Sequence, residues 1–333
     1  MRCLSTLLLI VAAFVSALPA QPTNQVKISF ECKAGSEFMA IGHTVFPIWN
    51  SKNVKITRAE FYISEIELHH SGNTSTPLAD QYLLVDASDP LVEFDLGDWP
   101  VDAIQGVTLH LGVPSSVNHL DPTTYPADHP LAPQNPTMHW GWAAGYRFMC
   151  IEGKVDNNTD GVPESTFEYH NLGDALYKTV ELTGMAEAEN GLLHLHFTLD
   201  YAKLFNNMPM TGNLLQHGSN GANNGMMENG ATQGFITMPA VSPNQEVTIN
   251  SRNISASPNP FSSETLIRYE LPASDALTLV VTNLLGQAVH TQNGLPATGT
   301  VHFEKGNLPS GVYHYAFFEN KELLARKNFI ISE

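Results

Sequence analysis

The stretch LLHLHFTLD at residues 192–200 alternates polar and apolar side chains with a period of two. Successive side chains of a strand point to opposite faces of its sheet, so this alternation predicts a strand with one apolar and one polar face. His194 and His196 then share the polar face, about 6.5–7 Å apart at the backbone. Similar short runs, rich in β-branched and aromatic residues, occupy residues 26–35, 60–70, 107–113 and 146–153.

The fold class that this pattern predicts is all-β. Gly, Pro, Asn and Asp separate the runs, and helical periodicity is confined to short pieces at residues 172–177 and 226–236. An antiparallel β-sandwich with long loops is the simplest architecture for such a chain. The segment 114–138 is much longer than a hairpin needs, and long loops in compact domains often have a function.

Three parts follow from the composition along the 333 residues. Residues 1–20 have a basic start, a short apolar run and small residues at the end, as a secretory signal peptide does. Turn-forming residues dominate 218–253 and place a boundary near Ser251. We therefore expect a signal peptide at 1–20, a main β domain at 22–251 and a small C-terminal β-sandwich at 252–333.

The charge of the chain excludes several partners. The formal net charge is −17, and no segment has the clustered Lys and Arg that nucleic acid or an anionic membrane surface would require. No later segment approaches the roughly 18 apolar residues of a membrane span. Instead, 14 histidines, nearly as many as all Lys and Arg together, favour metal binding, since imidazole is a common metal ligand.

Two cysteines, Cys32 and Cys150, remain after the signal peptide. Export to an oxidising compartment would allow one disulfide between them. The alternative is two buried thiols on separate strands, and sequence alone does not decide between these outcomes.

Four residues are the candidate metal ligands. His194 and His196, on one strand face, can converge on a single cation at roughly 2 Å per bond. His139 and Trp140 lie in the unusual segment TMHWGWAAGY at residues 137–146, where a bend would let both reach one metal. The alternatives are unliganded, solvent-facing histidines and tryptophans that pack into the core.

A second candidate site is a calcium-like loop. Asp156, Asn158 and Asp160 provide oxygen donors at alternate positions before Gly161, as at the start of a calcium-binding loop. The end of the loop departs from that pattern, so a plain hairpin turn is the alternative. Four more histidines near loops, taken singly, are expected on the surface: His110, His119, His129 and His170.

The C-terminal segment resembles the sorting domain that type IX secretion systems recognise. Its motifs occur in order: PNPF at 258–261, LLGQ at 284–287 and LPSGVY at 308–313. Glycines at these turns suit positions with positive φ between strands. The resemblance implies that type IX secretion machinery is a partner, and that the protein is secreted or held at the cell surface after crossing the outer membrane.

Most of residues 25–240 resembles the MbnP family of secreted copper-binding proteins, relatives of MopE. The resemblance rests on ISEIEL, YLLVDASD, LGVPSSVNHLDP, NPTMHWGWAAGYRFMCIEG and LLHLHFTLD in that order. It implies copper bound by histidines and by a tryptophan oxidised to kynurenine, with a dihaem peroxidase-like modifying partner. His194 and His196 then match the paired strand histidines, Trp140 the modified tryptophan and His139 a third histidine. Family members place the tryptophan two residues before a histidine. In this chain Trp142, and not a histidine, stands two residues after Trp140, which leaves the third ligand open.

The function expected is therefore a secreted or cell-surface copper-binding protein, with calcium as a further candidate metal. We expect no enzymatic activity, because no GxSxG, HExxH or P-loop motif is present. One alternative is a carbohydrate-binding or adhesive β-sandwich with Trp140 and Trp142 as ligand platforms. The other is a copper oxidoreductase, which would need an open coordination position on the metal.

Overall fold

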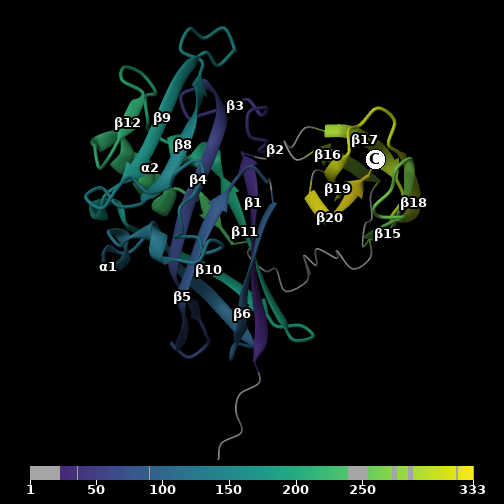
Figure 1. The fold of residues 1–333 in the computed structure, drawn as a ribbon, viewed down its shortest axis with the longest axis horizontal. Coiled ribbons are helices and arrows are strands. Elements are labelled where there is room, and N and C mark those ends of the chain that lie inside the picture. Colours follow the sequence, from purple (N-terminus) through teal and green to yellow (C-terminus); the bar gives the residue numbers. More distant parts are fainter. Residues whose placement is uncertain are drawn as a thin grey trace, which may run out of the picture.

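The described part of the chain forms two β domains in the computed structural model (Figure 1). The structure describes residues 23–35, 37–89, 91–238, 254–271, 276–283, 288–319 and 322–332. The expected signal peptide and the LLGQ turn lie outside these residues. No helix in the described ranges is long and apolar enough to cross a membrane.

The large domain packs two sheets face to face. The first has the order β13-β11-β1-β2, with β6 also paired to β1. Its strands are β1 (Asn24–Ala34), β2 (Glu37–Phe38), β6 (Leu91–Trp99), β11 (Leu192–Asp200) and β13 (Ile236–Thr237). We call this five-stranded sheet the small sheet.

The second, the large sheet, has the order β10-β7-β4-β8-β9-β12, with β3 and β5 paired to β4. Its strands are β3 (Phe46–Pro47), β4 (Asn53–His69), β5 (Ser75–Asp86), β7 (Ala103–Leu111), β8 (Arg147–Val155), β9 (Ser165–Leu172), β10 (Lys178–Glu187) and β12 (Leu215–His217). Short helices join the strands: α1 (Ser115–Asn118), η1 (Pro122–Thr124), η2 (Asp174–Leu176), η3 (Tyr201–Phe205) and α2 (Gly221–Thr232). This confirms the all-β class and the long-loop sandwich.

The core lies between the two sheets and follows the period-two pattern of β1 and β11. The inward side chains of β11 are buried, and Phe197 stacks on Phe30 of β1 with ring centroids 5.4 Å apart. Burial of each such ring stabilises the fold by about 1.5–3 kcal/mol. Unlike most neighbours, β1 and β11 run parallel, and so do β9 and β12. These two parallel pairings decide which side chains meet on the outer faces.

Cys32 and Cys150 are free, fully buried thiols on β1 and β8, in different sheets. The structure therefore has the second of the two expected arrangements. Burial raises the pKa of Cys150 to about 12, and burial also raises that of Cys32. Both side chains serve as small apolar core residues.

The C-terminal domain has its own core between two sheets. One has the order β14-β15-β18 and the other β17-β16-β19-β20. The strands are β14 (Ile254–Ser257), β15 (Glu264–Glu270), β16 (Leu277–Asn283), β17 (Ala288–Leu295), β18 (Thr298–Glu304), β19 (Gly311–Glu319) and β20 (Glu322–Ile331). Tyr313, Tyr315 and Phe317 form the buried face of β19. An ion pair of 2.6 Å joins Arg326 of β20 to Asp89 of the large domain.

Candidate metal site

The outer face of the large sheet gathers a carboxylate and two imidazoles. Antiparallel pairing of β8 with β9 places Glu152 opposite Glu168, and Cys150 opposite His170. Parallel pairing of β12 with β9 then places His217 beside His170. The two imidazoles stack with ring centroids 4.5 Å apart, and one ligand atom each of Glu168, His170 and His217 lies within 4.8 Å of the others. We call these three residues the β9–β12 cluster.

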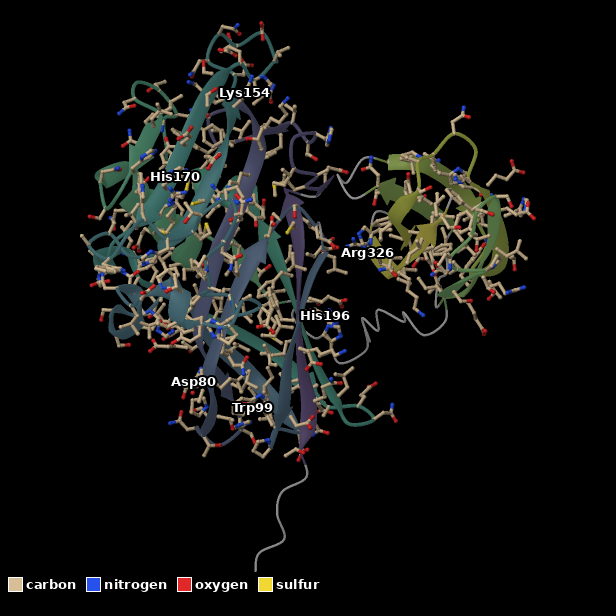
Figure 2. The ribbon with its side chains drawn as sticks, viewed as in Figure 1. Asp80, Trp99, Lys154, His170, His196 and Arg326 are labelled. Atoms are coloured by element: carbon tan, nitrogen blue, oxygen red, sulfur yellow. The ribbon has the colours of Figure 1, made fainter. Side chains whose placement is uncertain are left out.

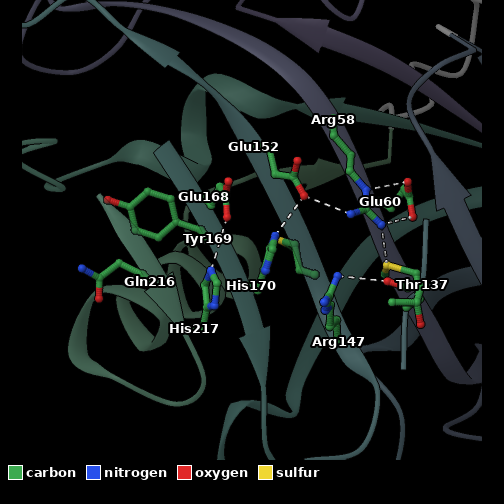
Figure 3. A network of polar contacts seen from close by, with 12 residues as sticks. Arg58, Glu60, Thr137, Arg147, Glu152, Glu168, Tyr169, His170, Gln216 and His217 are labelled. Carbon is green, nitrogen blue, oxygen red and sulfur yellow. Dashed lines mark hydrogen bonds and ion pairs between the residues drawn. The ribbon is translucent and has the colours of Figure 1, made fainter. Parts of the chain in front are cut away.

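A carboxylate relay orients His170 (Figure 3). Its Nε2 lies 2.9 Å from Oε1 of Glu152, and the same oxygen accepts a 2.9 Å hydrogen bond from Arg58. Arg58 also holds Glu60 through two hydrogen bonds of 2.8 and 3.0 Å. An ionised carboxylate only accepts, so Nε2 of His170 donates and its Nδ1 carries the free lone pair. Metal-binding histidines commonly have this second hydrogen bond.

The free nitrogen of His170 is buried without a partner. The residue is 6% exposed, and Nδ1 has no hydrogen bond to any part of the chain that the structure describes. Burial lowers the pKa of His170, so the ring is neutral at pH 7. Burial alone would raise the pKa of Glu152, but hydrogen bonds from His170 and Arg58 lower it overall. The cluster thus combines a neutral imidazole donor with a second imidazole and a carboxylate, a set that suits a divalent cation.

Trp140 projects from a hairpin onto this cluster. Its backbone N–H donates a hydrogen bond to the carbonyl oxygen of Gly145. Gly141 and Gly145 adopt positive φ values of 84° and 74°, which the turn requires. The indole lies edge-on to His217 at 5.0 Å and to His170 at 6.1 Å between ring centroids. The guanidinium of Arg147 lies 4.6 Å from the centre of the same indole. One face of the indole is therefore held by a cation–π contact.

Polar side chains of the segment after β7 hold the hairpin in place. The fully buried Asn118 accepts a 2.7 Å hydrogen bond from the backbone of Tyr146 and donates to Asp174 at 2.7 Å. Nδ1 of His119 lies 2.7 Å from the carbonyl oxygen of Trp142. The start of the long loop that follows β7 therefore anchors the segment that carries Trp140.

The four predicted ligands fall into separate places. Trp140 lies against His170 and His217, not against the pair on β11. His139 packs on Tyr146 with ring centroids 4.7 Å apart. His194 and His196 do share one face of the small sheet, with ring centroids 3.9 Å apart. Figure 2 labels His170 and His196 on opposite sides of the sandwich.

None of the three cluster residues was predicted as a metal ligand. His170 was expected on the surface, and this is wrong, because the sheet, Glu152 and the neighbouring imidazole cover it. His217 had no signal of its own. The alternation of Glu168 and His170 within STFEYHNL could have indicated a polar strand face, but the parallel partner β12 is too short to predict.

The calcium-like loop connects β8 and β9. Carboxylate oxygens of Asp156, Asp160 and Glu164 lie within 4.8 Å of one another. Asp156 is 3% exposed and accepts backbone hydrogen bonds from Thr159 and Gly161 at 2.7 and 2.8 Å. The side chain of Asn158 donates to Asp160 at 3.1 Å. These bonds make a well-ordered hairpin turn, and calcium binding at Asp156, Asn158 and Asp160 stays a prediction.

The comparisons with known proteins agree with this domain structure. Residues 255–332 match the secretion system C-terminal sorting domain, so the chain is exported and handled by the type IX secretion system. Fold and cluster together define an exported β-sandwich protein with a histidine-rich outer face. The chain belongs to the MbnP family, whose model matches residues 23–227.

Solved structures give weaker similarities. MbnP from Methylosinus trichosporium is 20% identical over 59% of this chain and 81% of that chain, with a TM-score of 0.42. The BSP domain of a biofilm-associated protein is 12% identical over 96% of this chain and 53% of that chain, with a TM-score of 0.22. No curated protein matches the chain.

Proposed function

We propose that this protein binds copper outside the cell, with His170 and His217 as the nitrogen ligands. The observation that carries the proposal is the buried, unpartnered Nδ1 of His170, beside a second imidazole and oriented by Glu152. A buried polar atom without a hydrogen bond costs about 1–3 kcal/mol. A metal ion at this point would remove that cost, and Glu168 supplies a carboxylate within reach.

The donor set favours copper among divalent ions. Imidazole nitrogens suit copper, zinc, nickel and iron, and Cu²⁺ binds most tightly at a site of weak geometric selectivity. The net charge of −17 raises the local concentration of any cation near the protein. The chain belongs to the MbnP family, and copper is the metal that the sequence resemblance to this family implies.

Trp140 is the residue that we propose is oxidised to kynurenine. An intact indole offers only an N–H donor and a π face, whereas kynurenine has an amine nitrogen and a ketone oxygen. Trp140 is 43% exposed, so an external oxidising protein can reach it, while its other edge faces His170 and His217. As the resemblance implies, a dihaem peroxidase-like protein would be that partner.

Elemental analysis of the purified mature protein tests the copper proposal. We expect bound copper that falls strongly in His170→Ala/His217→Ala and is unchanged in a matched control, His69→Ala/His70→Ala. The control pair is suitable because both of its rings already have hydrogen-bond partners, Thr108 for His69 and Thr76 for His70. Copper content that is equal in all these proteins would refute the proposal.

Peptide mass spectrometry tests the modification separately. Protein from the native source should show, on the peptide that contains Trp140, added oxygen and the loss of one carbon, as the conversion to kynurenine requires. Trp142 is 69% exposed and serves as the internal control. Oxidation of Trp142 alone, or of both residues equally, would contradict a role for the cluster in directing the reaction to Trp140.

A further inference from the structure

A cavity of about 310 Å³ lies between helix α2 and the loop at residues 206–213, which follows η3. Pockets for small molecules have volumes of about 300–1,000 Å³, so this cavity suits a small ligand. Tyr169 of β9 also lines it. Neighbouring strand residues point to opposite faces, so Tyr169 faces away from His170 and the β9–β12 cluster. We call this cavity the α2 pocket.

Two glycines of α2 leave the pocket open. Gly221 and Gly225 both line it, and a Cβ on either would meet no described residue within 4 Å, apart from the helix's own backbone. Gly230 of the same helix has a packing role instead, because a Cβ there would lie 3.0 Å from the side chain of Leu111. Glycine is, after proline, the least favourable residue inside a helix. Packing therefore does not account for Gly225, whereas room for a ligand against the helix does.

The loop that forms the opposite wall is held in a fixed shape. Trp49 and Lys52 donate hydrogen bonds of 2.7 and 3.1 Å to the carbonyl oxygens of Met208 and Met210. Asn207 and Met210 have φ values of 58° and 50°, which residues with side chains rarely adopt. Such conformations persist where the surrounding structure enforces them, and they cluster at binding sites. A wall that is already ordered lets a ligand bind at a lower entropic cost.

The lining combines hydrogen-bonding and apolar groups. Asn206, Asn207 and Asn213 contribute carboxamides, which carry both N–H donors and an oxygen acceptor. The side chains of Met208 and Met210 supply apolar surface beside them. A ligand that matches this lining has groups that both donate and accept hydrogen bonds, together with C–H groups that pack on the thioethers.

The charge of the pocket disfavours an anion. Its lining includes no Lys or Arg, and its one carboxylate, that of Glu228, is paired with Lys178 at 3.2 Å. The net charge of the whole chain is −17, which repels anions over a longer range. Phosphates and carboxylates would thus find no cationic partner in the lining, and an uncharged ligand remains.

We infer that the α2 pocket binds a neutral sugar. Each hydroxyl of a pyranose ring both donates and accepts hydrogen bonds, as the carboxamides do, and the C–H groups of the ring pack on the two methionines. Tyr169 and His170 lie on opposite faces of β9, so this site is independent of the copper proposal and uses neither Trp140 nor Trp142.

Ligand-observed NMR titration of the mature protein with glucose, galactose and N-acetylglucosamine tests the inference. We expect saturable binding of at least one of these sugars. Glucuronate, which adds a carboxylate to the glucose ring, should bind at least about tenfold more weakly than the sugar that binds best.

Gly225→Leu fills the pocket and should weaken sugar binding by at least about tenfold. The same change should raise the melting temperature, because leucine is a better helix former than glycine. Lost binding would then not reflect lost folding. Asn224→Leu is the matched control, since Asn224 is an exposed neighbour on α2 that does not line the pocket, and its binding should equal that of the wild type.

Three results would overturn the inference. The first is the absence of saturable binding for all three neutral sugars. The second is equal binding by the wild type and Gly225→Leu, which would place the sugar elsewhere on the chain. The third is glucuronate bound as tightly as the neutral sugars. If Gly225→Leu does not fold, Asn207→Gly decides, because it removes one carboxamide at a φ of 58° that glycine adopts readily. A Kd equal to that of the wild type would then reject the site.

Discussion

Glu152→Gln is the sharpest test of the proposed metal binding by the β9–β12 cluster. The change keeps the size of the side chain and removes its charge. In the structure, Oε1 of Glu152 accepts hydrogen bonds of 2.9 Å from both His170 and Arg58. Loss of such a partner outside the coordination shell reduces metal affinity by about 10–100-fold. The amide oxygen of Gln can still accept one hydrogen bond, so we expect the lower end, about tenfold or 1.4 kcal/mol.

Proton competition works against this loss and does not explain it. The negative charge of Glu152 raises the pKa of His170, although burial lowers it more. Removing that charge would lower the pKa further, so protons would compete less with copper. A weaker Kd in Glu152→Gln at pH 7 therefore reports the orientation and donor strength of the ring.

Competition titration of the metal-free proteins with a copper chelator gives the copper dissociation constants of the wild type and of Glu152→Gln. Glu60→Gln is the matched control, because Glu60 belongs to the same network through Arg58 but has no bond to His170. The control should bind copper like the wild type. A Kd for Glu152→Gln within about twofold of the wild type, or an equal loss in Glu60→Gln, would refute the relay.

Three more changes have clear expected results. Gly145→Ala should lower the free energy of unfolding by about 1–3 kcal/mol. Residue 145 has a φ of 74°, and a Cβ there would collide with the amide oxygen of Asn118. An unchanged melting temperature would contradict this. Trp140→Phe should remove the mass change from its peptide and weaken copper binding, as measured by the same titration, whereas Trp142→Phe should change neither. Calcium at millimolar concentration should raise the melting temperature of the wild type but not of Asp160→Asn, and equal shifts would exclude the loop as a calcium site.

Local periodicity predicted the parts of the fold that depend on neighbours along the chain. The alternation in residues 192–200 places Leu195 in the core and His194 and His196 on the other face, and the structure agrees. The prediction holds because strand geometry alone decides which side chains share a face. The same strand geometry puts Tyr313, Tyr315 and Phe317 together on the buried face of β19.

The positions of the cluster residues depend on pairings between strands that are distant in the sequence, and local sequence patterns do not reveal such pairings. His170 and His217 meet because β12 runs parallel to β9, and a three-residue strand has no detectable period. Trp140 reaches them because the hairpin at Gly141 and Gly145 turns the indole toward the large sheet. The structure places Trp140 beside His170 and His217 in place of the predicted pair on β11, and these two histidines come together through a register that no local pattern encodes.

Acid should destabilise the metal-free protein through His194 and His196. Burial lowers the pKa of His194 to about 4, aided by Lys27, and burial lowers that of His196 to about 3. In the unfolded chain both return to about 6.5. Below that pH the unfolded state binds protons that the folded state does not, so stability falls as the pH drops from about 6.5 toward the folded pKa values.

The size of this effect follows from the shifts. At 1.36 kcal/mol per pKa unit, full burial would cost about 2.5 kcal/mol per histidine at pH 4.5. Partial exposure reduces this to about 1–2 kcal/mol each. In the presence of a chelator, His194→Gln/His196→Gln should therefore lose about 2–4 kcal/mol less stability between pH 6.5 and 4.5 than the wild type.

Tryptophan fluorescence during urea unfolding measures this difference in the large domain, because all four tryptophans, at 49, 99, 140 and 142, belong to it. His302→Gln is the control, since the side chain of His302 is 48% exposed in the C-terminal domain. It should follow the wild-type dependence on pH. If the double variant also did so, protons would reach both rings freely in the folded state. The withdrawal of His194 and His196 from water, which lowers their pKa values, would then be wrong.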